Sequence, residues 1–178
     1  VLKMANSQMS GDIPEEIADL TSLTHIDFSG SSFRRIIPTS IARLTGLSKF
    51  RWLHGCFCPQ IPPWQASHNI SILLLFLDYL SLHNNDLTGI VPPQLGNMTN
   101  LIHLSLHGNQ LHGEIPKELG RLQSLDTLTL EDNLLTGRTP SQVCNLRQQE
   151  LIMFTTDCSD GSQGVLCPVP TCCTSCKA

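Results

Sequence analysis

Apolar residues recur along the chain in a pattern that fits neither a helix nor a strand throughout. The clearest example spans residues 101–122 (LIHLSLHGNQLHGEIPKELGRL), with apolar side chains at Leu101, Leu104, Leu106, Leu111, Ile115, Leu119 and Leu122. The spacing of two between Leu104 and Leu106 predicts a short strand. Turn residues follow at Asn109 and Gly113, and after Pro116 the segment KELGRL predicts a short helix. This unit has one apolar edge and nothing of its own to cover it.

The unit repeats, and prolines mark its period. A proline follows Ile, Val or, in the last copy, Thr at Pro14, Pro38, Pro62, Pro92, Pro116 and Pro140. The steps between these prolines are 24, 24, 30, 24 and 24 residues. A sustained period of this length indicates a stacked repeat protein, in which each unit is stabilised by its neighbours. The longer step predicts a six-residue insertion within residues 63–73.

The repeated unit resembles the plant-type leucine-rich repeat, LxxLxxLxLxxNxLxGxIPxxLGxL, with Met98 in place of the leading leucine. The resemblance covers residues 1–157 and implies about six repeats plus a last strand near residues 152–154. It implies a solenoid of the α/β class, a right-handed superhelix with a parallel concave β-sheet and an irregular or 3₁₀ convex side. Residues 158–178 are then expected to form a cysteine-rich C-terminal cap.

Some repeats depart from this consensus. In the second repeat Ser31 stands in the asparagine position and Arg35 in the glycine position. The third repeat, residues 47–62, is the most degenerate but keeps the leucine register. The insertion that follows it is interpreted as a loop on the convex side, a functional loop presenting Trp64, or an artefact of the gene model. The sequence leaves these three alternatives open.

Two columns of identical residues are expected to be structural. The resemblance implies that Asn85, Asn109 and Asn133 bond backbone groups at the turn, because buried amides need partners. Glycines at 11, 89, 113 and 137 are expected at turn positions that need permissive backbone angles.

Charge and motifs exclude several classes of function. The chain carries 11 basic and 15 acidic residues, with no basic stripe, so we expect no nucleic-acid partner. The longest apolar run, residues 70–77, is too short to cross a bilayer. The first residues, VLKMANSQ, resemble the middle of a repeat rather than a signal peptide, so we expect a fragment or processed form. No catalytic or cofactor-binding motif is present, and neither an enzyme nor a cofactor is predicted.

Eight cysteines indicate an oxidising, extracellular compartment. Six of them gather at the C-terminal end, where we predict disulfides among Cys144, Cys158, Cys167, Cys172, Cys173 and Cys176. A zinc site is the alternative, since two of these cysteines have the spacing of metal ligands. Two glycosylation sequons, at Asn69 and Asn97, agree with secretion. The tail resembles the cysteine-rich tails of secreted leucine-rich repeat proteins of diatoms.

Residues between the inward leucines are expected to face outward from the concave sheet. We predict a partner-binding surface there made by His25, Asp27, Lys49, Arg51, Tyr79, His83, His103, His107 and Glu131. The histidines in these columns are interpreted as a pH-responsive patch, a metal site or an ordinary solvated strand face, with no metal ligand assigned.

The resemblance implies extracellular recognition of a protein or peptide, as in receptor ectodomains. Two other functions remain open at this point. One is inhibition of secreted polysaccharide-degrading enzymes, and the other is a structural or surface-active role such as ice binding.

Overall fold

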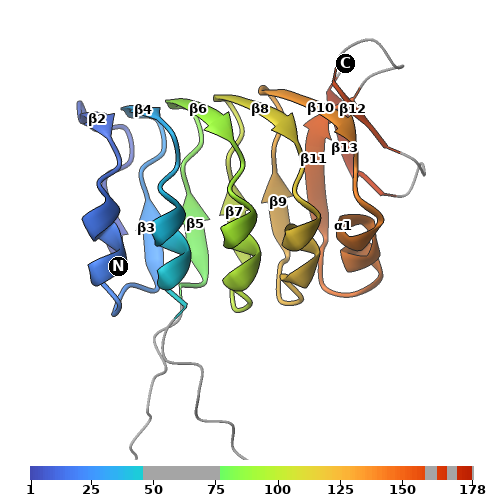
Figure 1. Cartoon of the computed structure of the whole chain (residues 1–178), viewed down its shortest axis with the longest axis horizontal. Helices are drawn as coiled ribbons and strands as arrows, with labels where there is room; N and C mark the ends of the chain where they lie inside the picture. The colour runs from blue at the N-terminus through green and yellow to red at the C-terminus, as the bar shows by residue number, and fades with distance from the viewer. Residues whose placement is uncertain (46–76, 159–163, 168–171, 178) are drawn as a thin grey trace, which may run out of the picture.

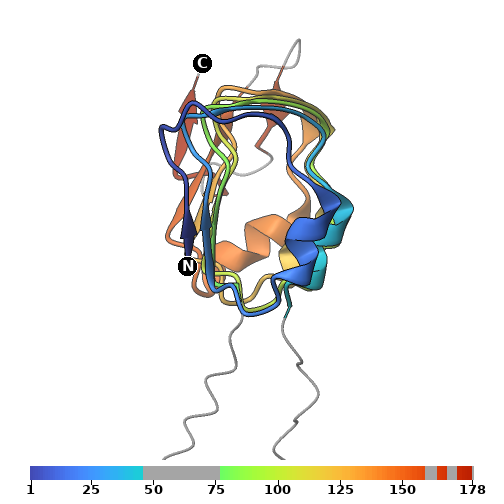
Figure 2. The same ribbon diagram turned by 90° about the vertical axis from the view of Figure 1, so that its left-hand side faces the viewer.

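The computed structural model describes residues 1–45, 77–158, 164–167 and 172–177. Within these ranges the chain winds into a solenoid whose rungs lie side by side (Figure 1). Each regular rung contributes a strand to one parallel sheet, a strand to a second parallel sheet, and a short 3₁₀ helix. Viewed along the solenoid, the two sheets and the helices enclose the core on different sides (Figure 2).

The larger sheet holds seven parallel strands in the described ranges. In order across the sheet they are β1 (Leu2–Lys3), β3 (His25–Asp27), β5 (Tyr79–Ser81), β7 (His103–Ser105), β9 (Thr127–Thr129), β11 (Met153–Asp157) and β13 (Ser175–Lys177). Its outward surface is called the sheet face below. The last strand predicted from the sequence is confirmed as β11, and it is longer than the predicted segment.

A second, six-stranded parallel sheet follows the turns of the rungs. Its strands are β2 (Ser10–Asp12), β4 (Ser32–Arg35), β6 (Asp86–Ile90), β8 (Gln110–Glu114), β10 (Leu134–Arg138) and β12 (Val165–Leu166). The sequence predicted only irregular or 3₁₀ structure on this side. The segments hold turn residues, and their extended form comes from pairing with the neighbouring rung.

The recurring prolines precede the helices. The helices are η1 (Glu15–Asp19), η2 (Thr39–Arg43), η3 (Pro93–Asn97), η4 (Lys117–Arg121), α1 (Ser141–Asn145) and η5 (Leu146–Gln148). Pro116, for example, is the extended residue just before η4, with φ −66° and ψ 131°. Proline fixes φ near this value, so each copy turns the chain in the same way. The predicted helix after Pro116 is confirmed.

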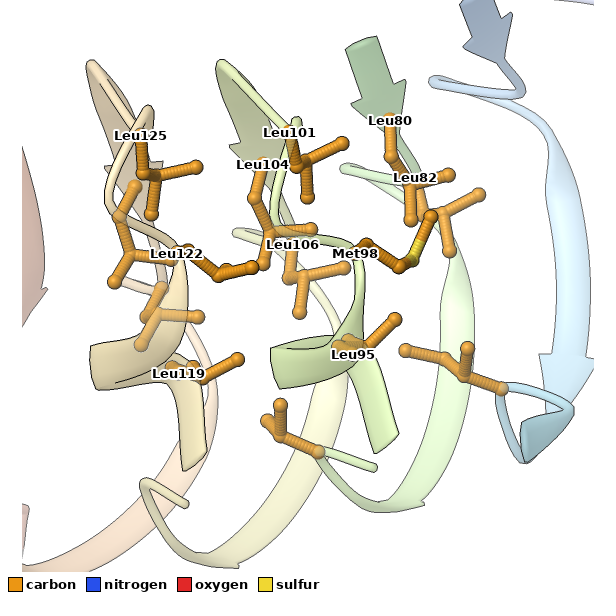
Figure 3. Close-up of a cluster of buried hydrophobic side chains, with 14 of the residues drawn as sticks. Leu80, Leu82, Leu95, Met98, Leu101, Leu104, Leu106, Leu119, Leu122 and Leu125 are labelled. Carbon is orange, nitrogen blue, oxygen red and sulfur yellow. The ribbon is translucent and has the colours of Figure 1, made fainter. Parts of the chain in front are cut away.

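Leucines and other apolar residues from the strands and helices fill the space between them. Figure 3 shows this packing over two successive rungs, with Leu80, Leu82, Leu95 and Met98 of one rung beside Leu104, Leu106, Leu119 and Leu122 of the next. All of these side chains are at most 1% exposed. Burial of one such side chain contributes about 1.5–3 kcal/mol. The core is therefore continuous through the rungs.

The predicted asparagine column is confirmed. The side-chain amide of Asn109 donates to the carbonyl of Leu106 in its own rung, at 2.9 Å, and to that of Leu82 in the preceding rung, at 3.0 Å. Its oxygen accepts from the backbone N–H of Leu87 at 3.1 Å. Asn85 and Asn133 repeat this arrangement. Each amide thus joins two rungs.

The predicted glycine column is also confirmed. Gly11, Gly89, Gly113 and Gly137 have φ between +82° and +105°, and Arg35, which replaces glycine in the second repeat, has φ +65°. A side chain costs free energy in this region of the backbone map, so Arg35 is strained.

The stacking of the rungs differs from the prediction at one point. Strand β3 pairs directly with β5, so that His25 lies opposite Tyr79 and Asp27 opposite Ser81. The described strands of the second and fourth repeats are therefore direct neighbours in the larger sheet. Those residues, and the predicted insertion within residues 63–73 with Trp64, lie outside the described part of the chain.

The C-terminal segment continues both sheets rather than only covering their end. Strand β13 pairs with β11, and β12 pairs with β10. Disulfides join Cys144 to Cys172 and Cys167 to Cys173, and Cys158 is disulfide-bonded as well. The prediction of C-terminal disulfides is confirmed for these cysteines, while the side chain of Cys176 lies outside the description. The domain boundary between residues 157 and 158 stays a prediction.

Candidate functional site

Three columns of side chains cross the sheet face, and strand pairing sets their order. The first holds His25, Tyr79, His103, Thr127 and Met153. The second holds Lys3, Asp27, Ser81, Ser105, Thr129 and Thr155. The third, two residues further along each strand, holds Ser29, His83, His107 and Glu131. Of the nine predicted binding residues, these columns contain His25, Asp27, Tyr79, His83, His103, His107 and Glu131.

The first column forms a stack of three rings. The ring of His25 lies 3.8 Å from that of Tyr79, with an angle of 7° between their planes. The ring of His103 lies on the other side of Tyr79, at 4.3 Å and 4°. The stack exists because neighbouring strands of a sheet are about 4.8 Å apart, close to the thickness of stacked rings. All three side chains are half-buried, so their edges border solvent.

The third column contains a second stack. The rings of His83 and His107 lie 4.3 Å apart with 12° between their planes. Glu131 follows on the next rung and accepts a hydrogen bond from the hydroxyl of Thr155. At the other end of the face, Asp27 accepts from the hydroxyl of Ser29 at 2.6 Å. An acid therefore stands beyond each end of the histidine pair.

The middle column places buried hydroxyl groups beneath the histidine pair. Ser81 is 0%, Ser105 2% and Thr129 7% exposed. The Nδ1 atom of His83 lies 2.7 Å from the Ser81 hydroxyl, and that of His107 lies 3.0 Å from Ser105 and 2.9 Å from Thr129. The sequence analysis did not select these three residues. Their hydroxyl side chains recur at the repeat period, which is the signal that could have identified them.

Burial makes several of these imidazoles harder to protonate. Loss of solvent lowers the pKa of His103 below the ordinary histidine value, and also that of His25, which Lys3 lowers further. Loss of solvent and the neighbouring His107 lower the pKa of His83. For Asp27, burial alone would raise the pKa, but hydrogen bonds from Ser29 outweigh it and lower the pKa. At neutral pH these three histidines are therefore uncharged.

Two predicted binding residues, Lys49 and Arg51, lie outside the described residues, and their role in partner binding stays a prediction. Among the described strands β3 pairs directly with β5, and the rings of His25 and Tyr79 are in contact at 3.8 Å.

A metal site on this face gains no support from the geometry. In the described part of the chain, the one group of three potential ligands within 4.8 Å of one another is Cys158, Cys167 and Cys173. These sulfurs are bonded in disulfides and so offer no thiolate. His83, His107 and Glu131 lie on successive rungs, but their ligand atoms do not converge in this way.

Sequence comparison identifies the repeat. The family profile described as Leucine rich repeat matches residues 77–135, and a second profile of the same description matches residues 22–44. The fold is a leucine-rich repeat solenoid. Domains of this fold are typically non-catalytic binding modules. A search of curated proteins gives no significant sequence match.

Solved structures with the same fold include plant receptor ectodomains. The ectodomain of the Arabidopsis thaliana receptor kinase GASSHO1/SCHENGEN3, in complex with CASPARIAN STRIP INTEGRITY FACTOR 2, is 33% identical, with a TM-score of 0.65 over 86% of this chain and 15% of that one. The Arabidopsis receptor kinase HAESA, in complex with the peptide hormone IDA and the co-receptor SERK1, is 27% identical, with a TM-score of 0.64 over 86% of this chain and 21% of that one. This chain resembles such ectodomains in fold and spans a fifth or so of their length.

A plant ice-binding protein has the same fold. It is 27% identical, with a TM-score of 0.61 over 90% of this chain and 40% of that chain. As for membrane spans, the described residues contain no helix whose length and apolar character would allow it to cross a bilayer.

Proposed function

We propose that this protein recognises a protein or peptide outside the cell through the sheet face. The ring stack of His25, Tyr79 and His103 carries the proposal. It is a rigid, half-buried set of rings on an open strand surface, and rigid aromatic side chains are common anchors at protein interfaces. Two of the similar receptor ectodomains were solved with a peptide or protein ligand, which supports recognition as the class of function.

The composition of the face supports a polypeptide partner. The face mixes aromatic rings, neutral imidazoles, buried hydroxyls and isolated acids, and such a mixture suits a partner with both apolar and hydrogen-bonding groups. Lys3, Asp27 and Glu131 are spread over different rungs, so no strong field of one sign favours a polyanion. The proposed binding residues are the seven predicted ones in the three columns, with Lys49 and Arg51 proposed from the sequence alone.

Capture from the native extracellular fluid tests this proposal. The wild-type protein is compared with the double variant Tyr79→Ala, His103→Ala, and with His112→Ala, which changes an exposed side chain on the smaller sheet. We expect a specific partner to bind the wild type and the His112→Ala control, and to lose at least tenfold in affinity for the double variant. Equal binding by all three proteins would contradict a site on the sheet face.

We also propose that Asn97 is glycosylated, which agrees with the proposed secretion. Asn97 and Thr99 of the sequon are exposed, and Asn97 ends the 3₁₀ helix η3. The helices visible in Figure 2 lie across the core from the larger sheet. A glycan there would leave the sheet face open. Expression in a secreting eukaryotic host, followed by mass measurement before and after enzymatic deglycosylation, tests this site with Asn97→Gln as the control. The second sequon, Asn69, lies outside the described residues and stays a prediction.

Ice binding is a second candidate function, because a plant ice-binding protein shares the fold at 27% identity. The sheet face itself is less regular than a flat array of one residue type, since its columns change from His to Tyr to Thr. Measurement of thermal hysteresis in a nanolitre osmometer decides this candidate. Inhibition of polysaccharide-degrading enzymes stays a prediction, and assays against a panel of such enzymes test it.

A further inference from the structure

The Nδ1 atoms of His83 and His107 are joined by hydrogen bonds to the buried hydroxyl groups beneath them. Besides the contacts already given, the Ser105 hydroxyl lies 3.3 Å from Nδ1 of His83 and 2.8 Å from the Thr129 hydroxyl. Three buried hydroxyls and two Nδ1 atoms thus share five contacts. Among the described residues, the hydroxyl of Ser81 has its contact with His83 alone.

The protons of this set can be counted. A neutral imidazole carries one N–H, and its other nitrogen has a single lone pair that accepts. With both Nδ1 atoms unprotonated, Ser81 donates to His83, Ser105 donates to His107, and Thr129 donates to Ser105. Every hydroxyl proton then has an acceptor of its own. This arrangement uses three of the five contacts and leaves no buried group unpaired.

The opposite tautomer leaves buried protons without acceptors. If Nδ1 of His83 carried the proton, Ser81 would have no acceptor for its hydroxyl proton. If Nδ1 of His107 carried the proton, it could no longer accept from Ser105 or Thr129. Ser105 would then have to share the Nδ1 lone pair of His83 with Ser81, or one hydroxyl proton would have no acceptor. A buried donor without a partner costs about 1–3 kcal/mol, enough to displace a tautomeric equilibrium at least fivefold.

We propose that this hydroxyl column holds His83 and His107 as the Nε2–H tautomers, with Ser81 as the positioning residue for His83. The Nε2–H groups lie on the ring edges away from the buried hydroxyls. The sheet face thereby offers two neighbouring N–H donors, on rings 4.3 Å apart, to one oxygen of a ligand. This inference rests on the proposed function and adds the chemistry of recognition.

The charges around the pair select the kind of oxygen. Asp27 lies one rung before His83, and Glu131 lies one rung after His107. Both acids would repel a carboxylate placed between the two donors. The acceptor is therefore an uncharged amide carbonyl, from the main chain of a peptide or from an Asn or Gln side chain.

Nuclear magnetic resonance of the free protein tests the tautomers without a partner. Long-range ¹H–¹⁵N correlation of histidine-labelled protein separates protonated from unprotonated ring nitrogens, and His83→Gln and His107→Gln assign the signals. We expect Nδ1 of both rings to be unprotonated in the wild type. In Ser81→Ala the Ser105 hydroxyl can serve either tautomer of His83, so we expect a mixture at His83 and no change at His107. Ser81→Thr, which keeps the hydroxyl, should restore the wild-type signal.

A protonated Nδ1 in the wild type would overturn the proposal, and so would a Ser81→Ala protein whose His83 signals are unchanged. A second arm adds acetamide or acetate, each to several hundred millimolar, and follows the Nε2 signals. Saturable shifts with acetamide that exceed those with acetate support a carbonyl acceptor, and the reverse order overturns that assignment. Because the tautomers are read in the free protein, failure of the partner-capture experiment would leave this result standing.

Discussion

Two sets of side chains recur at the same period along the regular rungs, one inside the turn and one on the sheet face. Asn85, Asn109 and Asn133 bond backbone groups of their own rung and of the preceding one. The ring nitrogens of His83 and His107 bond only side-chain hydroxyls among the described residues, and both side chains are half-buried.

This difference distinguishes repeated residues that the fold requires from repeated residues that can serve recognition. A side chain that satisfies backbone groups of two rungs ties these rungs together, so its replacement affects folding. A side chain that rests on its neighbours' side chains can change without breaking a rung. Periodicity alone does not separate the two cases, because both sets follow the repeat. The partners of the hydrogen bonds do.

Asn109→Ala is expected to have the largest effect. The change leaves the buried N–H of Leu87 without a partner, which costs about 1–3 kcal/mol. It also removes one of the two amide donors of the Leu82 and Leu106 carbonyls, which keep those of Asn85 and Asn133. We expect the free energy of unfolding to fall by about 3 kcal/mol, measured by urea denaturation followed by circular dichroism. Asn145→Ala is the control, since Asn145 is exposed and its side chain caps no helix. A loss as small as that of the control would place the asparagine column among the dispensable contacts.

The sequence predicted the parts of the fold that each rung determines for itself. The prolines, the buried leucines and the column of Asn109 follow from one repeat unit, and the structure confirms them. The smaller sheet was not predicted, because segments such as β8 contain a glycine and exposed polar residues and become strands only by pairing with neighbours. Local pattern carries little information about such pairing.

The sequence predicted less well which residues are neighbours within each column of the sheet face. The repeat register counts rungs, but it does not determine which rungs pair with each other. The segment 47–62 has the leucine spacing of a rung, yet the structure pairs β3 with β5. The stack of His25 on Tyr79 is a result of that pairing and had no signal in the sequence. The hydroxyl column was visible as a pattern, but its contacts with the histidines depend on ring orientation.

Arg35→Gly tests the glycine column, a third set of positions that recurs at the repeat period. These positions require a positive φ angle. Arg35 has φ +65° at a position where the other described repeats have glycine. Relief of this strain raises the free energy of unfolding by about 1–2 kcal/mol, and the greater freedom of glycine in the unfolded chain lowers it by about 0.5–1 kcal/mol. We expect a net gain of about 0.5–1 kcal/mol in the free energy of unfolding.

The ion pair of Arg35 with Asp12, at 3.4 Å, should hardly affect this result. The two side chains are 77% and 49% exposed, and exposed pairs contribute little. Asp12→Asn removes the ion pair while keeping the backbone strain, and it should leave the unfolding midpoint nearly unchanged. A loss of stability in Arg35→Gly would show that the arginine side chain makes a contribution that outweighs the strain of its backbone.

The smallest expected effect is the pH dependence of stability that the histidines of the sheet face produce. The pKa values of His25, His83 and His103 are lowered by loss of solvent, so below the ordinary histidine pKa the unfolded chain binds more protons than the folded one. Stability should therefore fall as the pH drops from about 7.5 to about 5.5, and level off once the folded-state pKa values are passed. The charged and titratable groups that face His83 are Asp27, His107 and Glu131. Because the pKa of Asp27 is lowered, the pH dependence of stability that Asp27 produces falls at lower pH than this range.

Urea denaturation at several pH values measures this slope, and the triple variant His25→Gln, His83→Gln, His103→Gln should flatten it. The same titration of Asn109→Ala should run parallel to the wild type at lower stability, because an amide does not titrate. If the triple variant keeps the wild-type slope, the protons are bound elsewhere and these histidines are as easily protonated in the folded protein as in the unfolded chain. If it flattens the slope without lowering stability at neutral pH, the histidine columns are free of a structural role, in contrast to the asparagine column.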